Sequence, residues 1–251
     1  MMVWLAPLFA AIAALYASVG FAGGSSYTAV LVLAGVAVPL VPVISLACNI
    51  IVSAGGVIRF ARASHIAWRR VAPLLILSVP CAWMGGRMPI SGAALVMTLG
   101  CSLLAAGALL LLGPDRAVTQ APAPADSGPG LLVLAMAAPL GLLSGIVGIG
   151  GGIFLAPILH LLRWDSARRI AGMAALFIFA NSLSGIAGQL TKLSNTTLLA
   201  QALGWWPLIL AVLIGGQLGS HIGTRHLPPA LIRRVTGLVI IIAAVRLLTT
   251  G

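Results

Sequence analysis

Two glycine-rich stretches are the residues of this chain best suited to chemistry. One runs from Ser144 to Pro157 and holds three consecutive glycines, and the other is Gly20–Ser26, which reads GFAGGSS. Glycine costs about 1 kcal/mol against alanine inside a helix, so these stretches predict helix breaks. A helix that restarts after a break presents unpaired N–H groups and the positive end of its dipole, which bind anions. We therefore predict an anion cradle made of Gly23, Gly24, Ser25, Ser26, Gly150, Gly151 and Gly152.

Tight helix packing through small residues is the alternative interpretation of each glycine stretch. Two asparagines add to the binding hypothesis, because Asn49 and Asn181 lie in the middle of long apolar runs. An amide in hydrocarbon is costly unless it is paired or faces a cavity. Their matching placement favours a role as side-chain donors to a substrate, with interhelical hydrogen bonding as the alternative.

Acidic side chains are nearly absent from the sequence. There is no Glu, and the three Asp residues, Asp115, Asp126 and Asp165, lie outside the apolar runs. A transporter of cations or protons normally keeps a carboxylate within the membrane. A buried carboxylate would also repel an anion. The composition therefore favours an anionic substrate.

Motifs for catalysis or metal binding are absent as well. The sequence has no paired carboxylates, no H-E-x-x-H and no G-x-S-x-G, and its glycine runs are not P-loops. The three cysteines lie inside apolar runs without C-x-x-C spacing, so neither a disulfide framework nor a metal site is indicated. We expect a protein that is not an enzyme and that uses no cofactor and no metal.

The composition is that of a chain dissolved in a lipid bilayer. Hydrophobic residues make up 61% and charged residues 7%, whereas soluble domains carry about a quarter charged residues. The net charge of +11 comes from basic residues scattered between apolar runs. This pattern is typical of cytoplasmic membrane loops and not of a nucleic-acid surface. The N-terminus lacks a basic region, which favours a first membrane segment over a signal peptide.

Apolar runs between charges and Pro/Gly breaks divide the chain into ten segments, which we expect to be helices because lone strands leave backbone groups unsatisfied in lipid. They are 3–19, 26–41, 43–60, 71–87 and 90–112, then 131–147, 153–162, 170–190, 204–222 and 232–249. A polar, Pro-rich stretch separates the two sets. It predicts a first repeat over 1–112, a cytoplasmic linker over 113–130 and a second repeat over 131–251. The 153–162 run is too short to span, which favours half of a broken or re-entrant pair.

Small and polar residues recur between the halves in the same order, which indicates a duplication. The matched pairs are Gly20/Gly148, Gly23/Gly151, Gly24/Gly152, Asn49/Asn181 and Gly85/Gly215, at spacings of 128 to 132 residues.

Basic residues show how the two copies are related. Arg62, Arg69 and Arg70 follow the third segment, but Lys192 alone follows the eighth. Five segments per repeat is an odd number, so the second copy should be inverted, as in secondary transporters. Placing both termini outside puts eleven of the fourteen basic residues on the cytoplasmic side. We predict an all-α integral membrane protein of about eight to ten transmembrane or half-membrane helices, arranged as two inverted-topology repeats.

The motifs resemble those of the TauE/SafE sulfite exporter family, also called the toluenesulfonate uptake permease family. The similarity covers nearly the whole chain. It rests on the glycine run before Pro157, its copy at Gly20–Gly24, and an ending that reads GGQLG from Gly215, then LPP from Leu227 and RR from Arg233. The first copy departs from the fuller pattern at Ala22, where the second has Gly150. The resemblance implies secondary transport of sulfur-containing anions such as sulfite, sulfonates or sulfoacetate.

These observations predict a transporter, expected to export, for small sulfur-containing anions across the bacterial inner membrane. An anion channel and a non-transporting membrane scaffold are the alternatives. Its partners would be the anion and the lipid bilayer, without nucleic acid. The sequence does not indicate which ion, if any, is coupled to transport, or whether the protein forms a homo-oligomer.

Overall fold

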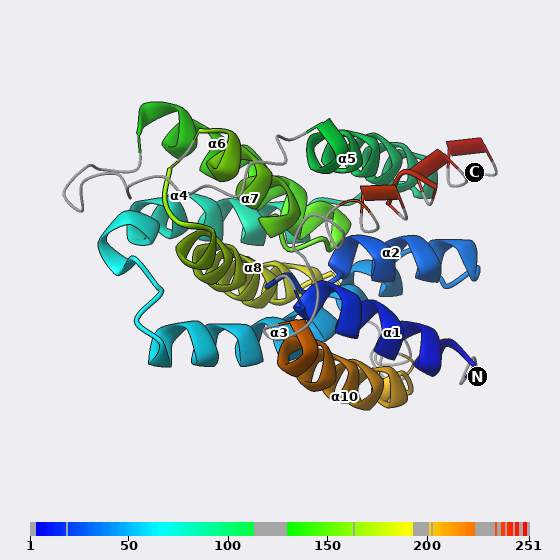
Figure 1. Ribbon diagram of the computed structural model, residues 1–251. Coiled ribbons are helices and arrows are strands. Elements are labelled where there is room, and N and C mark those ends of the chain that lie inside the picture. The colour runs from blue at the N-terminus through cyan, green and yellow to red at the C-terminus, as the bar shows by residue number, and fades with distance from the viewer. Residues whose placement is uncertain are drawn as a thin grey trace.

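The structure is a computed structural model. It describes residues 4–112 apart from 19, 130–192 apart from 163, then 201, 203–223 and scattered positions between 234 and 249. Within these residues the secondary structure is helical and no strand occurs. The prediction of an all-α protein is thus confirmed (Figure 1). The predicted linker over 113–130 lies outside the described residues except for Gly130.

Apart from the second helix, the described helix bounds follow the predicted segments closely. The helices are α1 (Leu5–Ala17), α2 (Gly24–Leu33), α3 (Leu40–Arg62), α4 (Trp68–Arg87), α5 (Gly92–Leu112), α6 (Leu131–Val147), α7 (Gly152–Leu161), α8 (Ala167–Leu190) and α10 (Trp206–Gly223). The predicted last segment, 232–249, lies mostly outside the described residues, and its described positions are helical.

Among the described residues, three stretches are long and apolar enough to cross a membrane: Leu40–Arg62, Gly92–Leu109 and Arg168–Leu190. Their mean hydropathies are 2.1, 1.9 and 1.8. Large apolar side chains also lie on the outside of the bundle, among them Ile76, which is 72% exposed, and Ile214, which is 60% exposed. Such an outer surface suits lipid and not water. The molecule is an integral membrane protein.

The second helix is shorter than its predicted segment. α2 has ten residues, the same length as α7. It ends at Leu33 because Gly35 takes a left-handed conformation, with φ of 71°, and terminates the helical turn. A helix of ten residues is about 15 Å long and cannot span the bilayer core. Both halves of the chain therefore contain a half-membrane helix after a glycine break.

The two halves are interlocked by their outer helices. α1 packs along α10, and α4 packs along α6, as Figure 1 shows at opposite sides of the bundle. A Cβ at Gly215 would collide with the backbone oxygen of Ala10, and one at Gly85 would collide with that of Leu142. Glycine is needed at both places because the helix backbones touch. The two contacts are equivalent in the two halves, because Gly85 matches Gly215 at a spacing of 130 and Ala10 matches Leu142 at a spacing of 132.

The centre of the bundle is the pair α3 and α8, which pack against each other over much of their length. Gly56, late in α3, lies against Ala175, early in α8, where an added Cβ would be 3.3 Å from the alanine Cβ. Gly185, late in α8, lies against Leu46, early in α3. The two central helices therefore run antiparallel, and each carries one of the predicted asparagines.

Candidate functional site

The break before α2 is built by two glycines with positive φ. Gly20 has φ of 86°, and Gly23, the residue that caps α2, has φ of 92°. L-residues with a side chain rarely adopt this conformation, so glycine is required here. No side chain caps the helix. The backbone N–H groups of Ser26 and Tyr27 bond to the Gly23 carbonyl, at 3.0 Å each.

The break before α7 repeats this construction. Gly148 ends α6 with φ of 82°, Gly150 has 85°, and Gly151 caps α7 with φ of 73°. Again no side chain caps the helix. The first N–H groups of each half-helix are therefore not satisfied by a side-chain cap. The left-handed conformations also show why alanine could not replace these glycines without strain.

Asn49 of α3 lies between the two breaks. Its side chain is fully buried, and Nδ2 donates to the carbonyl of Gly148 at 3.3 Å. A Cβ at Gly24 would collide with this amide, and one at Gly150 would lie 3.1 Å from its nitrogen. Nδ2 keeps a second hydrogen, and Oδ1 has no partner. The structure therefore brings Asn49, Gly24 and Gly150 together.

Hydroxyl groups around Asn49 fix the breaks in place. One turn earlier on α3, the Ser45 hydroxyl lies 2.9 Å from the carbonyl oxygen of Gly148 and 3.0 Å from that of Gly24, so its one hydrogen is shared between them. The hydroxyl of Thr28 also donates to the Gly24 carbonyl, at 2.8 Å. These bonds join α2, α3 and the α6–α7 connection. Sequence reasoning missed Thr28, which stands one turn after Gly24.

Asn181 of α8 is placed differently from Asn49. It is fully buried, but Nδ2 donates to the carbonyl of Phe177 within its own helix, at 2.8 Å. A Cβ at Gly152 would meet Ile178 and not Asn181. The reason lies in the spacing, since Asn181 comes 29 residues after Gly152 and Asn49 only 25 after Gly24. The four additional residues move the amide one helical turn further along.

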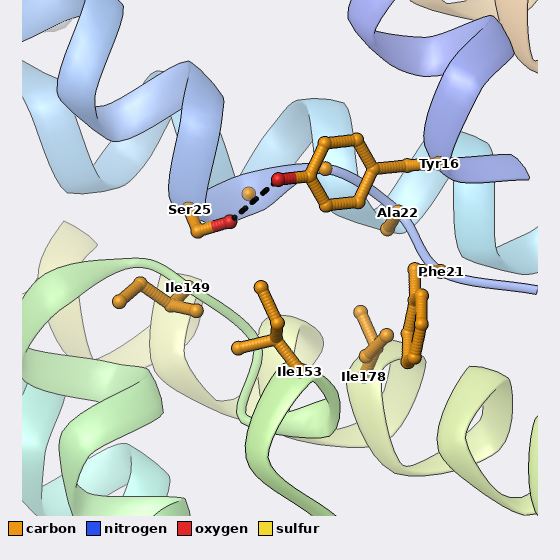
Figure 2. Close-up of a pocket in the computed structure, with 9 residues that line it drawn as sticks. Tyr16, Phe21, Ala22, Ser25, Ile149, Ile153 and Ile178 are labelled. Carbon is orange, nitrogen blue, oxygen red and sulfur yellow. Dashed lines mark hydrogen bonds between the residues drawn. The ribbon is translucent and has the colours of Figure 1, made fainter. Parts of the chain in front are cut away.

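A small pocket with room for about one water molecule opens beside the first break. Of the predicted residues it is lined by Gly23, Gly24 and Ser25, and Figure 2 shows its wall. The other predicted residues, Ser26, Asn49, Gly150, Gly151, Gly152 and Asn181, do not line it. Sequence reasoning missed the remaining lining residues, Tyr16, Phe21, Ala22, Ile149, Ile153 and Ile178.

Tyr16 connects the pocket to the first half-helix. Its hydroxyl lies 2.8 Å from Oγ of Ser26 and 3.4 Å from Oγ of Ser25. The tyrosine is 1% exposed and comes from the end of α1. It stands nine residues before Ser25, and no helical or strand periodicity marks that separation. No pattern in the sequence therefore indicates this contact.

The pocket has no charged lining residue. In the part of the chain that the structure describes, the acidic residue is Asp165, which lies in the loop between α7 and α8. That loop follows the C-terminal end of α7, opposite the end that Gly151 caps. The carboxylate is buried there against Arg70, with 2.9 Å between Nη1 and Oδ2. Among the described residues, no negative side-chain charge therefore lies beside the glycine breaks.

Apolar spans and two half-membrane helices that begin after glycine breaks are features of secondary transporters. The chain belongs to the TauE/SafE sulfite exporter family, because the model of that family, described as "Sulfite exporter TauE/SafE", matches residues 5–247. The family membership that the motifs predicted is thus confirmed.

Two relatives agree with this class. The chain is 31% identical over 255 residues to "Probable membrane transporter protein y4hK" of Sinorhizobium fredii, with 97% of each chain covered. It is 26% identical over 216 residues to "Probable membrane transporter protein" of Haemophilus influenzae, with 81% of this chain and 78% of the relative covered. No solved structure matches the chain. The protein is a membrane transporter of the TauE/SafE type.

Proposed function

We propose that this protein is a secondary transporter that exports small sulfur-containing anions across the bacterial inner membrane. One observation carries the proposal: two uncapped half-helices begin on either side of the buried Asn49 amide, and none of the described carboxylates lies beside them. Their free N–H groups and aligned dipoles stabilise a negative charge at the midplane. The family description and the relatives' names support transport, and the sulfur anion is inferred from the family's own name.

The packing supports an alternating-access mechanism with inverted repeats. α3 and α8 occupy matching places in the two halves and run antiparallel. The outer helices also pair across the two halves. α1 of the first half packs on α10 of the second, and α4 of the first half packs on α6 of the second. A binding site at such a repeat interface becomes exposed to each side in turn as the halves rock. The predicted orientation, with both termini outside, belongs to this proposal.

Uptake of labelled sulfite into vesicles that contain the purified protein tests the function. A transporter gives a flux that saturates as the sulfite concentration rises. An open anion channel would give current that does not saturate in this way, and a scaffold would give no flux above empty vesicles. Export is tested with right-side-out and inverted membrane vesicles, because net movement out of the cell appears as accumulation in the inverted ones only.

A further inference from the structure

A positively charged side chain lies within the apolar span of α3. Arg59 stands in the last turn of this helix, inside the span Leu40–Arg62, and its side chain is half-buried. Its Nη1 donates to the hydroxyl of Ser220 on α10. Arg59 follows Asn49 by ten residues, which is about 15 Å along the helix, so it lies away from the glycine breaks. A charge at such a place needs a partner.

No described carboxylate is that partner. Asp165 is the acidic residue in the described part of the chain, and it pairs with Arg70 and Arg169. Ser220 accepts one of the five N–H groups of the Arg59 guanidinium, and its own hydroxyl donates to a backbone carbonyl of α10. The negative end of the α3 dipole supplies only about half a charge. The guanidinium therefore keeps donors and positive charge for a ligand.

A space beside Gly55, one turn earlier on α3, is bordered by hydrogen-bond donors. A Cβ at Gly55 would lie 3.9 Å from Nη2 of Arg59 and 3.3 Å from Nε2 of Gln217. Outside the adjoining backbone of α3, no other described atom would come within 4 Å of it. Gln217 is exposed, so the space opens to the outside of the bundle between α3 and α10. An oxyanion in this space would accept hydrogen bonds from both side chains.

An apolar stripe on α10 continues from this space toward the middle of the helix. Ile214, one turn before Gln217, is 60% exposed, and Leu210, one turn further, is 48% exposed. Figure 1 shows α10 at the edge of the bundle, beside α3. A hydrocarbon chain gains from contact with such side chains, whereas a free inorganic ion does not. The surface thus combines donors at one end with an apolar stripe along the membrane.

We propose that this surface binds an anionic phospholipid. Its phosphate accepts hydrogen bonds from Arg59 and Gln217, and an acyl chain lies along Ile214 and Leu210. The end of α3 that carries Arg59 is its predicted cytoplasmic end, and a basic pocket between membrane helices on that side suits an anionic headgroup. The lipid joins α3 to α10 and stabilises their contact. This site is additional to the proposed transport and does not depend on which anion is transported.

Thermal unfolding of the purified protein in a phosphate-free detergent tests the site. Phosphatidylglycerol is titrated, and phosphatidylcholine and inorganic phosphate are titrated in parallel. A ligand that binds only the folded state raises the melting temperature by about 5–10 °C at a hundredfold excess over its Kd. We expect phosphatidylglycerol to give a saturating rise of this size, phosphatidylcholine a smaller one and inorganic phosphate none.

Variants locate the effect on the protein. Arg59→Gln should lose the rise with phosphatidylglycerol, and Arg59→Lys should keep part of it. Arg62→Gln is the matched control, because Arg62 stands in the same helical turn, is exposed and loses the same charge. It should keep the rise. Gly55→Ala keeps every charge but places a methyl group in the space, so it should weaken the rise.

The wild-type protein alone can refute this inference. No rise with phosphatidylglycerol, or an equal rise with phosphatidylcholine or inorganic phosphate, would overturn it. An equal loss in folded Arg59→Gln and Arg62→Gln would do the same, because the attraction would then be general and not local. Sulfite flux is measured separately, so its absence would contradict the proposed function and leave the lipid site standing.

Discussion

The guanidinium of Arg70 and the carboxylate of Asp165 form a buried ion pair that joins the start of α4 to the loop between α7 and α8. Arg70 also donates to the carbonyl of Trp164 at 3.1 Å, and its guanidinium lies 3.9 Å from the centre of that residue's ring. Arg169 approaches the same carboxylate at 3.8 Å. The two halves of the chain are therefore linked by charge at this end of the bundle.

Removal of either member of this pair should destabilise the protein strongly. Arg70→Gln leaves a carboxylate that is fully buried, and breaking a buried pair in this way costs about 3–5 kcal/mol. Thermal unfolding in detergent measures the loss. Arg69→Gln is the matched control, because Arg69 is the neighbouring residue and is exposed. Equal melting temperatures for Arg70→Gln and the wild-type protein would show that the pair contributes nothing.

A side chain at Gly151 should be more harmful than the strain of its left-handed backbone alone would make it. Gly151→Ala and Gly35→Ala each place a side chain at a φ near 70°, a strain of about 1–3 kcal/mol. A Cβ at Gly35 meets nothing within 4 Å, whereas one at Gly151 lies 2.9 Å from the Phe177 ring. We expect folded Gly151→Ala to lose anion binding and Gly35→Ala to keep it. Similar affinities in the two proteins would place the ligand away from this break.

Asn49 should matter more than Asn181 for binding. Asn49→Leu removes the amide that lies between the two breaks, and loss of one neutral hydrogen bond typically costs about 0.5–1.5 kcal/mol, or more with a charged partner. Asn181 bonds within its own helix, so Asn181→Leu should have the smaller effect on affinity. Titration of sulfite against both folded variants decides the order. A larger loss in Asn181→Leu would point to a site centred on α8.

Positively charged solutes should neither move through the protein nor compete with its substrate. The glycine breaks present N–H groups, and no carboxylate lines the pocket. Choline added to the sulfite uptake assay at concentrations similar to that of sulfite tests this expectation. Sodium methanesulfonate serves as the matched anionic competitor. Inhibition by choline equal to that by methanesulfonate would refute an anion-selective site.

The inverted orientation is tested by cysteine labelling, in a background where Cys48, Cys81 and Cys101 are replaced. A cysteine at Ala123 should be protected from an impermeant thiol reagent in intact cells, and one at Asn195 should react. Both positions lie outside the described residues, so the assay depends on topology alone. Labelling of both, or of neither, while permeabilised cells label at both, contradicts two inverted repeats with external termini.

Local chemistry explains which features could be predicted from the sequence. The helix positions and the two breaks were predictable, because the length of an apolar run and the presence of a glycine run determine the local backbone structure. The positive φ of Gly151 follows in the same way. The place of Tyr16 beside Ser25, and of Ile178 against Gly152, depends on how distant helices pack, and no local signal marks it. The offset of Asn181 by one turn is of the same kind, since matching positions in two repeats need not make matching contacts.

The pairing of α1 with α10 has a consequence for biosynthesis. Gly219 packs against the backbone of Ala14, although it follows 205 residues later in the chain. At about 5–20 residues per second, the ribosome needs roughly 10–40 s to reach it. During this interval the first helix must wait in the bilayer without its partner. The part of α1 that α10 later covers, around Ala10 and Ala14, consists of alanine and exposes no polar side chain to lipid. The nascent helix can therefore persist there until α10 arrives.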